Sequence, residues 1–169
     1  HGSYNHQNDL YQELIRTPLS FKIPSVNPKK IDSFSQDVDI FPTIVDLVGL
    51  EPITQFQGKS LKPLLNGSSK KVNEYQIAQK GEGTAIATFR KGHWKLIIKD
   101  NNPAELYNLL IDPVEKSNVI DVNQELATTL FEEYKEVVDS FPKYLNYDQP
   151  LLQYIDEEKR KRLIEEGYF

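Results

Sequence analysis

The sequence contains no cysteine and no methionine among its 169 residues. Without cysteine the chain can form no disulfide, no thiolate metal site and no cysteine nucleophile, and it carries no redox evidence for a cellular compartment. Position 1 is a histidine, and no charged stretch followed by an apolar one opens the chain. Neither a translation start nor a signal peptide can be read, so we expect the true N-terminus of the protein to lie elsewhere.

An excess of basic charge and long apolar runs are absent as well. Twenty Lys and Arg residues against twenty-five Asp and Glu residues give a formal net charge of −5, and the charges are mixed along the chain. This distribution argues against nucleic acid as a partner. No apolar run approaches the roughly 18 residues that a membrane helix needs, so no membrane span is expected. The 38% of hydrophobic and 11% of aromatic residues suffice for a core, in one domain or two small lobes.

The first part of the chain predicts short elements separated by loops. A helix is expected over residues 8–16, because apolar residues recur there at helical spacing, and Pro18 ends it. Alternation of apolar and polar residues predicts a short strand over residues 19–23. Residues 25–36 are polar and are interpreted as a loop.

A second helix is predicted to follow this loop. Asp37 or Asp39 can cap its N-terminus, and Pro42 falls in its first turn, where a missing N–H costs little. Gly49 follows where a left-handed C-terminal turn is needed. One face of this helix is apolar and carries Ile40, Phe41, Ile44, Val45 and Val48.

Residues 50–74 are rich in Gly, Pro, Lys and Ser, so we place the change between two lobes there. The next region alternates apolar and polar residues in three runs separated by turn residues, which indicates an antiparallel meander. The predicted strands cover residues 75–79, 84–90 and 94–99. Trp94 and Tyr107 are interpreted as core aromatics of this lobe.

A long helix is predicted after these strands. Asp121 can cap its N-terminus, with Gln124 three residues later, and Pro142 ends it. Its apolar stripe should lie across the sheet. The stripe comprises Leu126, Leu130, Phe131, Tyr134, Val137 and Val138. A last short helix is expected over residues 156–166, closed by Gly167.

These elements predict an α+β chain whose function the residue types alone leave open. The histidines are scattered, and no nucleophile, base and metal ligands cluster in the sequence. Such a chain is typical of a binding or scaffolding module.

Four separated parts of the sequence add information through their order. The first covers residues 1–19 and ends in Arg-x-Pro-Leu. The others are DVDIFPTIVDLVG at residues 37–49, QGKSLKPLLNG at 57–67, and RKGHWKLI at 90–97 with ELYNLLIDPVEKSNV at 105–119. In order and spacing they resemble the sulfatases of the alkaline phosphatase superfamily, and the resemblance covers nearly the whole chain.

The resemblance implies a fold and a division of the chain. The parent enzymes have an α/β fold, of which this fragment forms an α+β part. Residues 1–70 correspond to the C-terminal portion of the catalytic, alkaline-phosphatase-like domain. Residues 71–169 correspond to the C-terminal subdomain, a small antiparallel sheet packed by a long C-terminal helix.

The resemblance also implies a chemistry. In sulfatases a formylglycine, as its hydrate, attacks sulfur, and acidic and amide side chains hold a divalent metal, usually calcium. The formylglycine signature, Cys or Ser followed by x-Pro-x-Arg, and the acidic metal pairs are absent from these residues. We therefore expect a C-terminal fragment of an enzyme that hydrolyses sulfate esters. It should need the preceding part of the same protein, hold no cofactor itself and be inactive alone.

Three histidines are the candidate site residues. His6 lies where sulfatases have a late lysine or histidine that touches the sulfate, and its near-neutral pKa suits proton donation to the sulfate or leaving-group oxygen. His1 matches the structural histidine of a Glu-His-Gly turn, and its spacing to His6 is too short for the metal-site histidine. His93 falls in a strand turn, where a surface position is the simpler interpretation and the substrate rim the weaker alternative.

Two alternatives stay open at this point. The parent protein can be a phosphodiesterase or phosphonate monoester hydrolase of the same superfamily, because these share the motifs. The chain can also be a non-catalytic binding or structural module that kept the sulfatase tail. If a catalytic lobe is missing, the chain should expose an apolar surface between Leu19 and Val48 and tend to self-associate.

Overall fold

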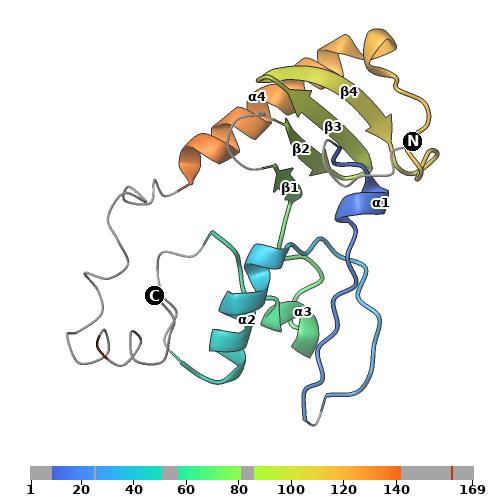
Figure 1. Ribbon diagram of the computed structural model, residues 1–169. Coiled ribbons are helices and arrows are strands. Elements are labelled where there is room, and N and C mark those ends of the chain that lie inside the picture. Colours follow the sequence, from blue (N-terminus) through green and yellow to red (C-terminus); the bar gives the residue numbers. More distant parts are fainter. Residues whose placement is uncertain (1–8, 25, 51–56, 81–85, 142–160, 162–169) are drawn as a thin grey trace.

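The largest element of the structure is a four-stranded antiparallel sheet in which each strand pairs with its neighbour in the sequence (Figure 1). The computed structural model describes residues 9–24, 26–50, 57–80, 86–141 and 161. The strands in these ranges are β1 (Tyr75–Gln79), β2 (Ile86–Lys91), β3 (Trp94–Lys99) and β4 (Asn102–Asn108).

Tight turns set the register of the sheet. Asp100 and Asn101 both have a positive φ, 50° and 58°, as a two-residue type I′ hairpin requires between β3 and β4. The predicted strands β1 and β3 are confirmed residue for residue. The predicted strand at 84–90 is confirmed from Ile86, and its first two residues lie outside the described ranges. The predicted meander omitted β4, whose sequence alternates only weakly.

One face of the sheet packs against the long helix α4 (Gln124–Ser140), which follows a short 3-10 turn, η2 (Ile120–Val122). The buried residues of this core are Ala87, Phe89, Leu96, Ile98, Leu106, Ala127, Leu130 and Tyr134. The predicted apolar stripe of α4 is confirmed, because its members all pack in or against this core. The predicted cap is wrong. Asp121 lies within η2, and Asn123 precedes the helix without a side-chain capping bond.

Asp39 organises the second part of the fold, which contains η1 (Asp37–Asp39) and helix α2 (Ile40–Leu47). Its buried carboxylate accepts hydrogen bonds from the backbone N–H groups of Gln36 (2.9 Å) and Lys59 (2.8 Å) and from Asn73 Nδ2 (2.7 Å). The predicted cap of α2 is wrong, because Asp39 occupies the N-cap position but makes no side-chain capping bond there. Its carboxylate instead completes a capping box with Gln36 at the start of η1. It also connects α2 to two later stretches of chain.

Gly58 approaches this region so closely that no side chain fits. A Cβ placed on Gly58 lies 1.9 Å from the backbone oxygen of Val38. We expect Gly58→Ala to push the chain around Lys59 away from Asp39 and to lower the free energy of unfolding by about 3 kcal/mol or more. Gly49→Ala is the control, because Gly49 has φ 74° and no atom within 4 Å, and its loss should be near 1 kcal/mol. Equal losses in urea unfolding contradict this account.

Helix α2 has one buried and one exposed side. Thr43 and Val45 are buried, whereas Phe41, Ile44 and Val48 are 55%, 46% and 64% exposed. Leu19 is exposed as well, so the stretch from 19 to 48, where the sequence predicted an apolar surface, does expose several large apolar side chains.

Three of the short elements differ from expectation. Residues 19–23 form no strand, because alternation alone supplies no backbone partner and none is present in the described ranges. The first helix is only α1 (Gln12–Ile15), shorter than the predicted 8–16, since Tyr11 is extended. Helix α3 (Lys62–Asn66) lies in the expected linker, with Pro near its start and Gly67 (φ 83°) at its end.

Of the predicted last helix, residues 156–166, only Lys161 is described, and it is helical. Across the described ranges, no helix is long and apolar enough to span a membrane.

Candidate functional site

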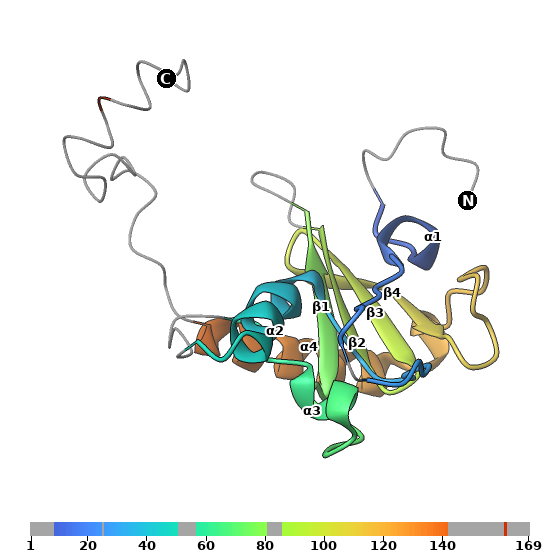
Figure 2. The ribbon, with the colours of Figure 1, turned by 90° about the horizontal axis from the view of Figure 1, so that it is seen from below.

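The face of the sheet opposite α4 is unusually rich in polar side chains. In an antiparallel pair, directly opposed residues point to the same side. Lys95 is opposite both Arg90 and Tyr107, and Ile97 is opposite Glu105, so these side chains share one face. We call it the polar face; it carries Gln76, Thr88, Arg90, Lys95, Ile97, Glu105 and Tyr107. Figures 1 and 2 show α4 and α1 on opposite sides of the sheet, so the N-terminal segment passes this face.

A buried ion pair lies at the centre of the polar face. Lys95 and Glu115 form a salt bridge, and their side chains are 0% and 1% exposed. Each also binds the N-terminal segment. Lys95 Nζ donates to the backbone oxygen of Leu10 at 2.7 Å, and Glu115 Oε2 accepts from the backbone N–H of Gln12 at 2.5 Å. Burial lowers the pKa of Lys95, and the hydrogen bond and charge of Glu115 oppose that shift.

A second network on the same face is centred on Glu105. Its Oε2 accepts hydrogen bonds from the hydroxyls of Tyr11 (2.8 Å) and Tyr107 (2.7 Å), and its Oε1 contacts Lys99 Nζ at 2.5 Å. The rings of Tyr11 and Tyr107 also pack edge to face, with centroids 6.2 Å apart. Burial raises the pKa of Glu105, but the hydrogen bonds from Lys99, Tyr107 and Tyr11 outweigh burial and hold that pKa below its usual value. The carboxylate is therefore charged when the tyrosines donate to it.

Glu115 reaches the polar face from a constrained turn. Its φ is 56°, in the left-handed region that residues other than glycine rarely adopt. The turn is fixed by Asp112, whose side chain accepts hydrogen bonds from the backbone N–H groups of Lys116 (3.1 Å) and Ser117 (2.9 Å). A strained backbone persists only where its surroundings hold it. In this turn the Glu115 carboxylate lies against the Lys95 ammonium group and forms the salt bridge with it.

A second segment covers the β1 side of the same face. Gln76 Nε2 donates to the backbone oxygen of Ser35 at 2.8 Å, and the backbone N–H of Ile77 donates to Gln36 Oε1 at 2.7 Å. The guanidinium of Arg90 lies over the ring of Phe34, 4.9 Å from its centroid. The polar face therefore joins two early stretches of the chain to the later sheet.

The tyrosines make stability depend on pH in the alkaline range. Burial and the hydrogen bond to Glu105 raise the pKa of Tyr11 to about 12, and the same causes raise the pKa of Tyr107. Unfolded tyrosine titrates near pH 10, so the folded chain holds protons that the unfolded chain releases between about pH 10 and 12. Stability present below pH 10 should therefore fall as pH rises through this window. Urea unfolding at a series of pH values gives the slope of the unfolding free energy against pH, which reports the number of protons released on unfolding. Tyr11→Phe should reduce that number by close to one between about pH 10 and 12. An unchanged slope contradicts the assignment.

Of the three histidines predicted as site residues, only His93 is described, and it is not part of the polar face. His1 and His6 lie outside the described residues. His93 is exposed in the turn between β2 and β3, where its ring lies 5.5 Å from that of Trp94 and its backbone oxygen accepts from Leu109 N at 2.7 Å. Trp94 packs against the core as predicted, whereas Tyr107 is buried on the polar face instead.

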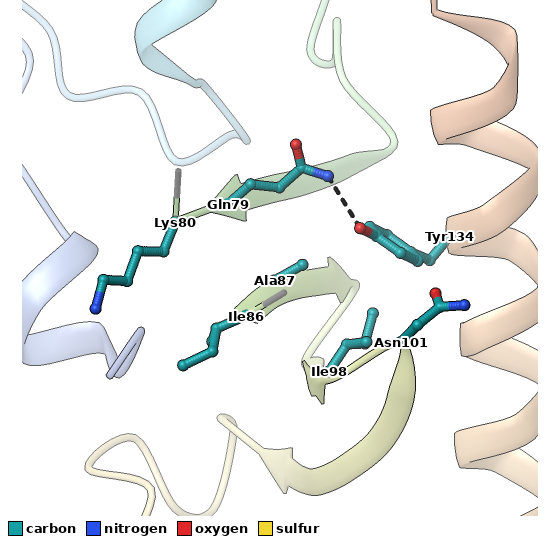
Figure 3. Close-up of a pocket in the computed structure, with 7 residues that line it drawn as sticks. All are labelled: Gln79, Lys80, Ile86, Ala87, Ile98, Asn101 and Tyr134. Atoms are coloured by element: carbon teal, nitrogen blue, oxygen red, sulfur yellow. Dashed lines mark hydrogen bonds between the residues drawn. The ribbon is translucent and has the colours of Figure 1, made fainter. Parts of the chain in front are cut away.

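A hollow of about 460 Å³ lies between the sheet and α4 (Figure 3). Its lining residues are Gln79, Lys80, Ile86, Ala87, Ile98, Asn101 and Tyr134. Gln79 Nε2 donates to the Tyr134 hydroxyl at 2.9 Å, and Lys80 points away from that pair. Among the described residues that line it, none is a carboxylate or a histidine.

In the part of the chain that the structure describes, no three His, Cys, Asp or Glu side chains come together as a metal-binding group. Lys95 and Lys99 on this face are paired with Glu115 and Glu105. Arg90 instead donates to Gln76 Oε1 at 3.2 Å, and among the described residues its buried Nε has no hydrogen-bond partner. The polar face is therefore suited to hold the N-terminal segment against the sheet. Sequence reasoning missed Lys95 and Glu115 as partners, and the available signal was a lysine within the apolar strand WKLIIK.

The described residues form an α+β fold in which a four-stranded antiparallel sheet packs against a long helix on one face and holds earlier segments of the chain on its polar face. Comparison with known proteins gives this class a name. The model of the family described as "N-sulphoglucosamine sulphohydrolase, C-terminal" matches residues 1–140. The chain therefore belongs to this family, which confirms the predicted C-terminal part of a sulfatase in the alkaline-phosphatase-like superfamily.

Two curated relatives agree with the family match. The chain is 28% identical to a choline-sulfatase of Rhizobium meliloti, over 67% of this chain and 23% of the relative. It is 26% identical to an N-acetylglucosamine-6-O-sulfatase of Bacteroides thetaiotaomicron, over 84% and 29%. A solved 2-O GAG sulfatase is 27% identical, over 60% of this chain and 23% of that one, with a TM-score of 0.49. The chain thus spans roughly a quarter of the length of the curated relatives it matches.

Proposed function

We propose that this chain is the C-terminal region of an enzyme that hydrolyses sulfate esters. The observation that carries the proposal is the family match over residues 1–140, and the curated relatives named as sulfatases support it. A formylglycine hydrate and a divalent metal, usually calcium, supply the nucleophile and the charge stabilisation in such an enzyme. Both belong to the preceding chain in this proposal, and these 169 residues alone are inactive.

His6 is the residue of this chain that we assign to the reaction. It contacts the sulfate in this proposal and donates a proton to the sulfate or leaving-group oxygen, because an imidazole titrates near neutral pH. His93 takes a secondary place on the substrate rim, which its exposure in a turn allows. His1 keeps the structural role in the Glu-His-Gly turn.

The division of the chain follows the same proposal. Residues 1–70 complete the catalytic lobe and residues 71–169 form the C-terminal subdomain. The exposed side of α2 supports the first assignment, because Phe41, Ile44 and Val48 offer apolar area that a preceding sheet can cover. In the chain alone the same surface favours self-association.

The proposal is tested by assaying the longer protein that contains this sequence with 4-nitrophenyl sulfate. We expect turnover that a chelator of divalent metals abolishes and that added calcium restores. The 169-residue chain, assayed in parallel, is expected to give no turnover. A folded longer protein that leaves the sulfate ester intact contradicts the proposal.

A further inference from the structure

We infer that Asn66 is a site of spontaneous deamidation, at which the backbone nitrogen of Gly67 attacks the Asn66 side chain and expels ammonia. Asn66-Gly67 is the single Asn-Gly pair in the sequence, and both residues are exposed at the end of α3. The inference concerns described residues and depends on no enzymatic activity of the chain or of the longer protein.

The backbone nitrogen of Gly67 is open to act as the nucleophile. Gly67 follows α3 with φ 83°, and it carries no Cβ that could crowd its nitrogen. Among the described residues its N–H donates no hydrogen bond, and the last turn is closed instead by Ser69 N, which donates to the backbone oxygen of Pro63 at 2.9 Å. The proton of this N–H can therefore be lost to solvent without breaking a hydrogen bond.

The amide group of Asn66 is turned toward the same stretch of backbone. Its Oδ1 accepts a hydrogen bond from Ser68 N at 2.9 Å. Attack at Cγ puts negative charge on this oxygen, and a backbone N–H already directed at it stabilises that charge. Lys29 adds a cation, because its Nζ donates to the backbone oxygen of Leu64 at 2.7 Å and lies 3.7 Å from a Cβ placed on Gly67.

The reaction needs only water and hydroxide as further reactants. Hydroxide removes the proton of Gly67 N, and the nitrogen forms a bond to Cγ of Asn66. The bond between Cγ and Nδ2 then breaks, and Nδ2 takes a proton from water and leaves as ammonia. Water opens the resulting succinimide at either carbonyl, which gives aspartate or isoaspartate. Ring closure requires rotation of the Asn66 backbone, which is the last residue of a helix of 5 residues, where helices fray.

Two other asparagines make the same side-chain bond and serve as an internal comparison. Asn108 and Asn118 each accept a hydrogen bond at 3.1 Å from the backbone N–H two residues later, as Asn66 does. The nitrogens that follow them belong to Leu109 and Val119, and these donate to backbone oxygens at 2.7 Å and 2.9 Å. Both of these residues also carry a bulky side chain. The fold therefore leaves the nucleophile open at Asn66 and engages it at the other two positions.

The test incubates the longer protein at mildly alkaline pH and follows its peptides by mass spectrometry over time. We expect Asn66 to convert about 10-fold or more faster than Asn108 and Asn118, because their nucleophiles must first break a backbone hydrogen bond. Loss of ammonia, which marks the succinimide, should precede a mixture of isoaspartate and aspartate. Equal rates at the three asparagines, or aspartate without isoaspartate, overturn the inference.

Gly67→Ala separates attack by the backbone nitrogen from simple hydrolysis of an exposed amide. The added methyl group crowds the attacking nitrogen, so conversion of Asn66 should slow by about 10-fold. Gly49→Ala is the matched control, because Gly49 also has a positive φ after a helix, and it should leave the rate at Asn66 unchanged. An unchanged rate in Gly67→Ala contradicts the proposed attack.

Asn66→Gln checks that the mass change belongs to position 66. The longer side chain brings its amide carbon one bond further from Gly67 N, so the peptide of this variant should stay unmodified over the same period. The same mass change in that peptide assigns the reaction to another residue and overturns the inference.

Discussion

Replacement of His6 by alanine in the longer protein is expected to lower the turnover of an aryl sulfate by roughly 100-fold or more. This is the range for the loss of a positioned general acid. KM should change much less than kcat, because a proton donated in the transition state contributes little to binding of the ground state. Steady-state kinetics near neutral pH measure both values. Activity equal to that of the wild type removes His6 from the mechanism.

His6→Lys is the matched control for this variant. The resemblance to sulfatases admits lysine or histidine at this position, since either can donate to the sulfate. His6→Lys should therefore retain more turnover than His6→Ala. Thermal unfolding of both variants shows that the lost activity does not come from a lost fold.

The second large effect is expected for the stability of the chain itself. Lys95→Met leaves Glu115 buried without its cation, and the loss of one partner of a buried pair costs about 3–5 kcal/mol. Urea unfolding can be followed by the fluorescence of Trp94, the single tryptophan of the chain, which packs against the core. The urea concentration at the midpoint of unfolding should fall strongly. The slope of the unfolding free energy against urea concentration should stay unchanged.

Lys91→Met makes the same chemical change at an exposed ion pair on the same sheet. The Lys91 side chain is 47% exposed where it meets Glu133, so its loss should cost less than about 1 kcal/mol. Removal of both buried charges, Lys95→Met with Glu115→Gln, should cost less than Lys95→Met alone. A Lys95→Met variant as stable as Lys91→Met contradicts the role given to the buried pair.

The elements that the sequence predicted well are those with a repeating local pattern. The apolar stripe of α4 and the strands β1 and β3 depend on spacings of two to four residues, which are visible in any short window. Gly49 likewise indicates the end of α2 in the sequence, because the positive φ of 74° found there favours glycine. Apolar periodicity and a glycine at a positive φ each depend on neighbouring residues only, so both can be recognised in a short stretch of sequence.

The polar face could not be predicted in the same way, because its partners are distant in the sequence. Tyr11 and Glu105 are 94 residues apart, and Gln12 and Glu115 are 103 apart. Nothing near Glu115 in the sequence indicates which backbone group it binds. The strand expected at residues 19–23 failed for a related reason, since a strand exists only with a partner. The family resemblance supplied the class of protein, and the structure supplied the contacts.

The most direct test of the account compares two ester substrates of the longer protein. The values of kcat/KM for 4-nitrophenyl sulfate and for the 4-nitrophenyl ester of phenylphosphonate are measured under the same conditions. A sulfatase whose C-terminal region is this chain should prefer the sulfate ester, and His6→Ala should reduce that preferred reaction. A preference for the phosphonate ester contradicts the account and assigns the parent protein to the phosphonate monoester hydrolases instead.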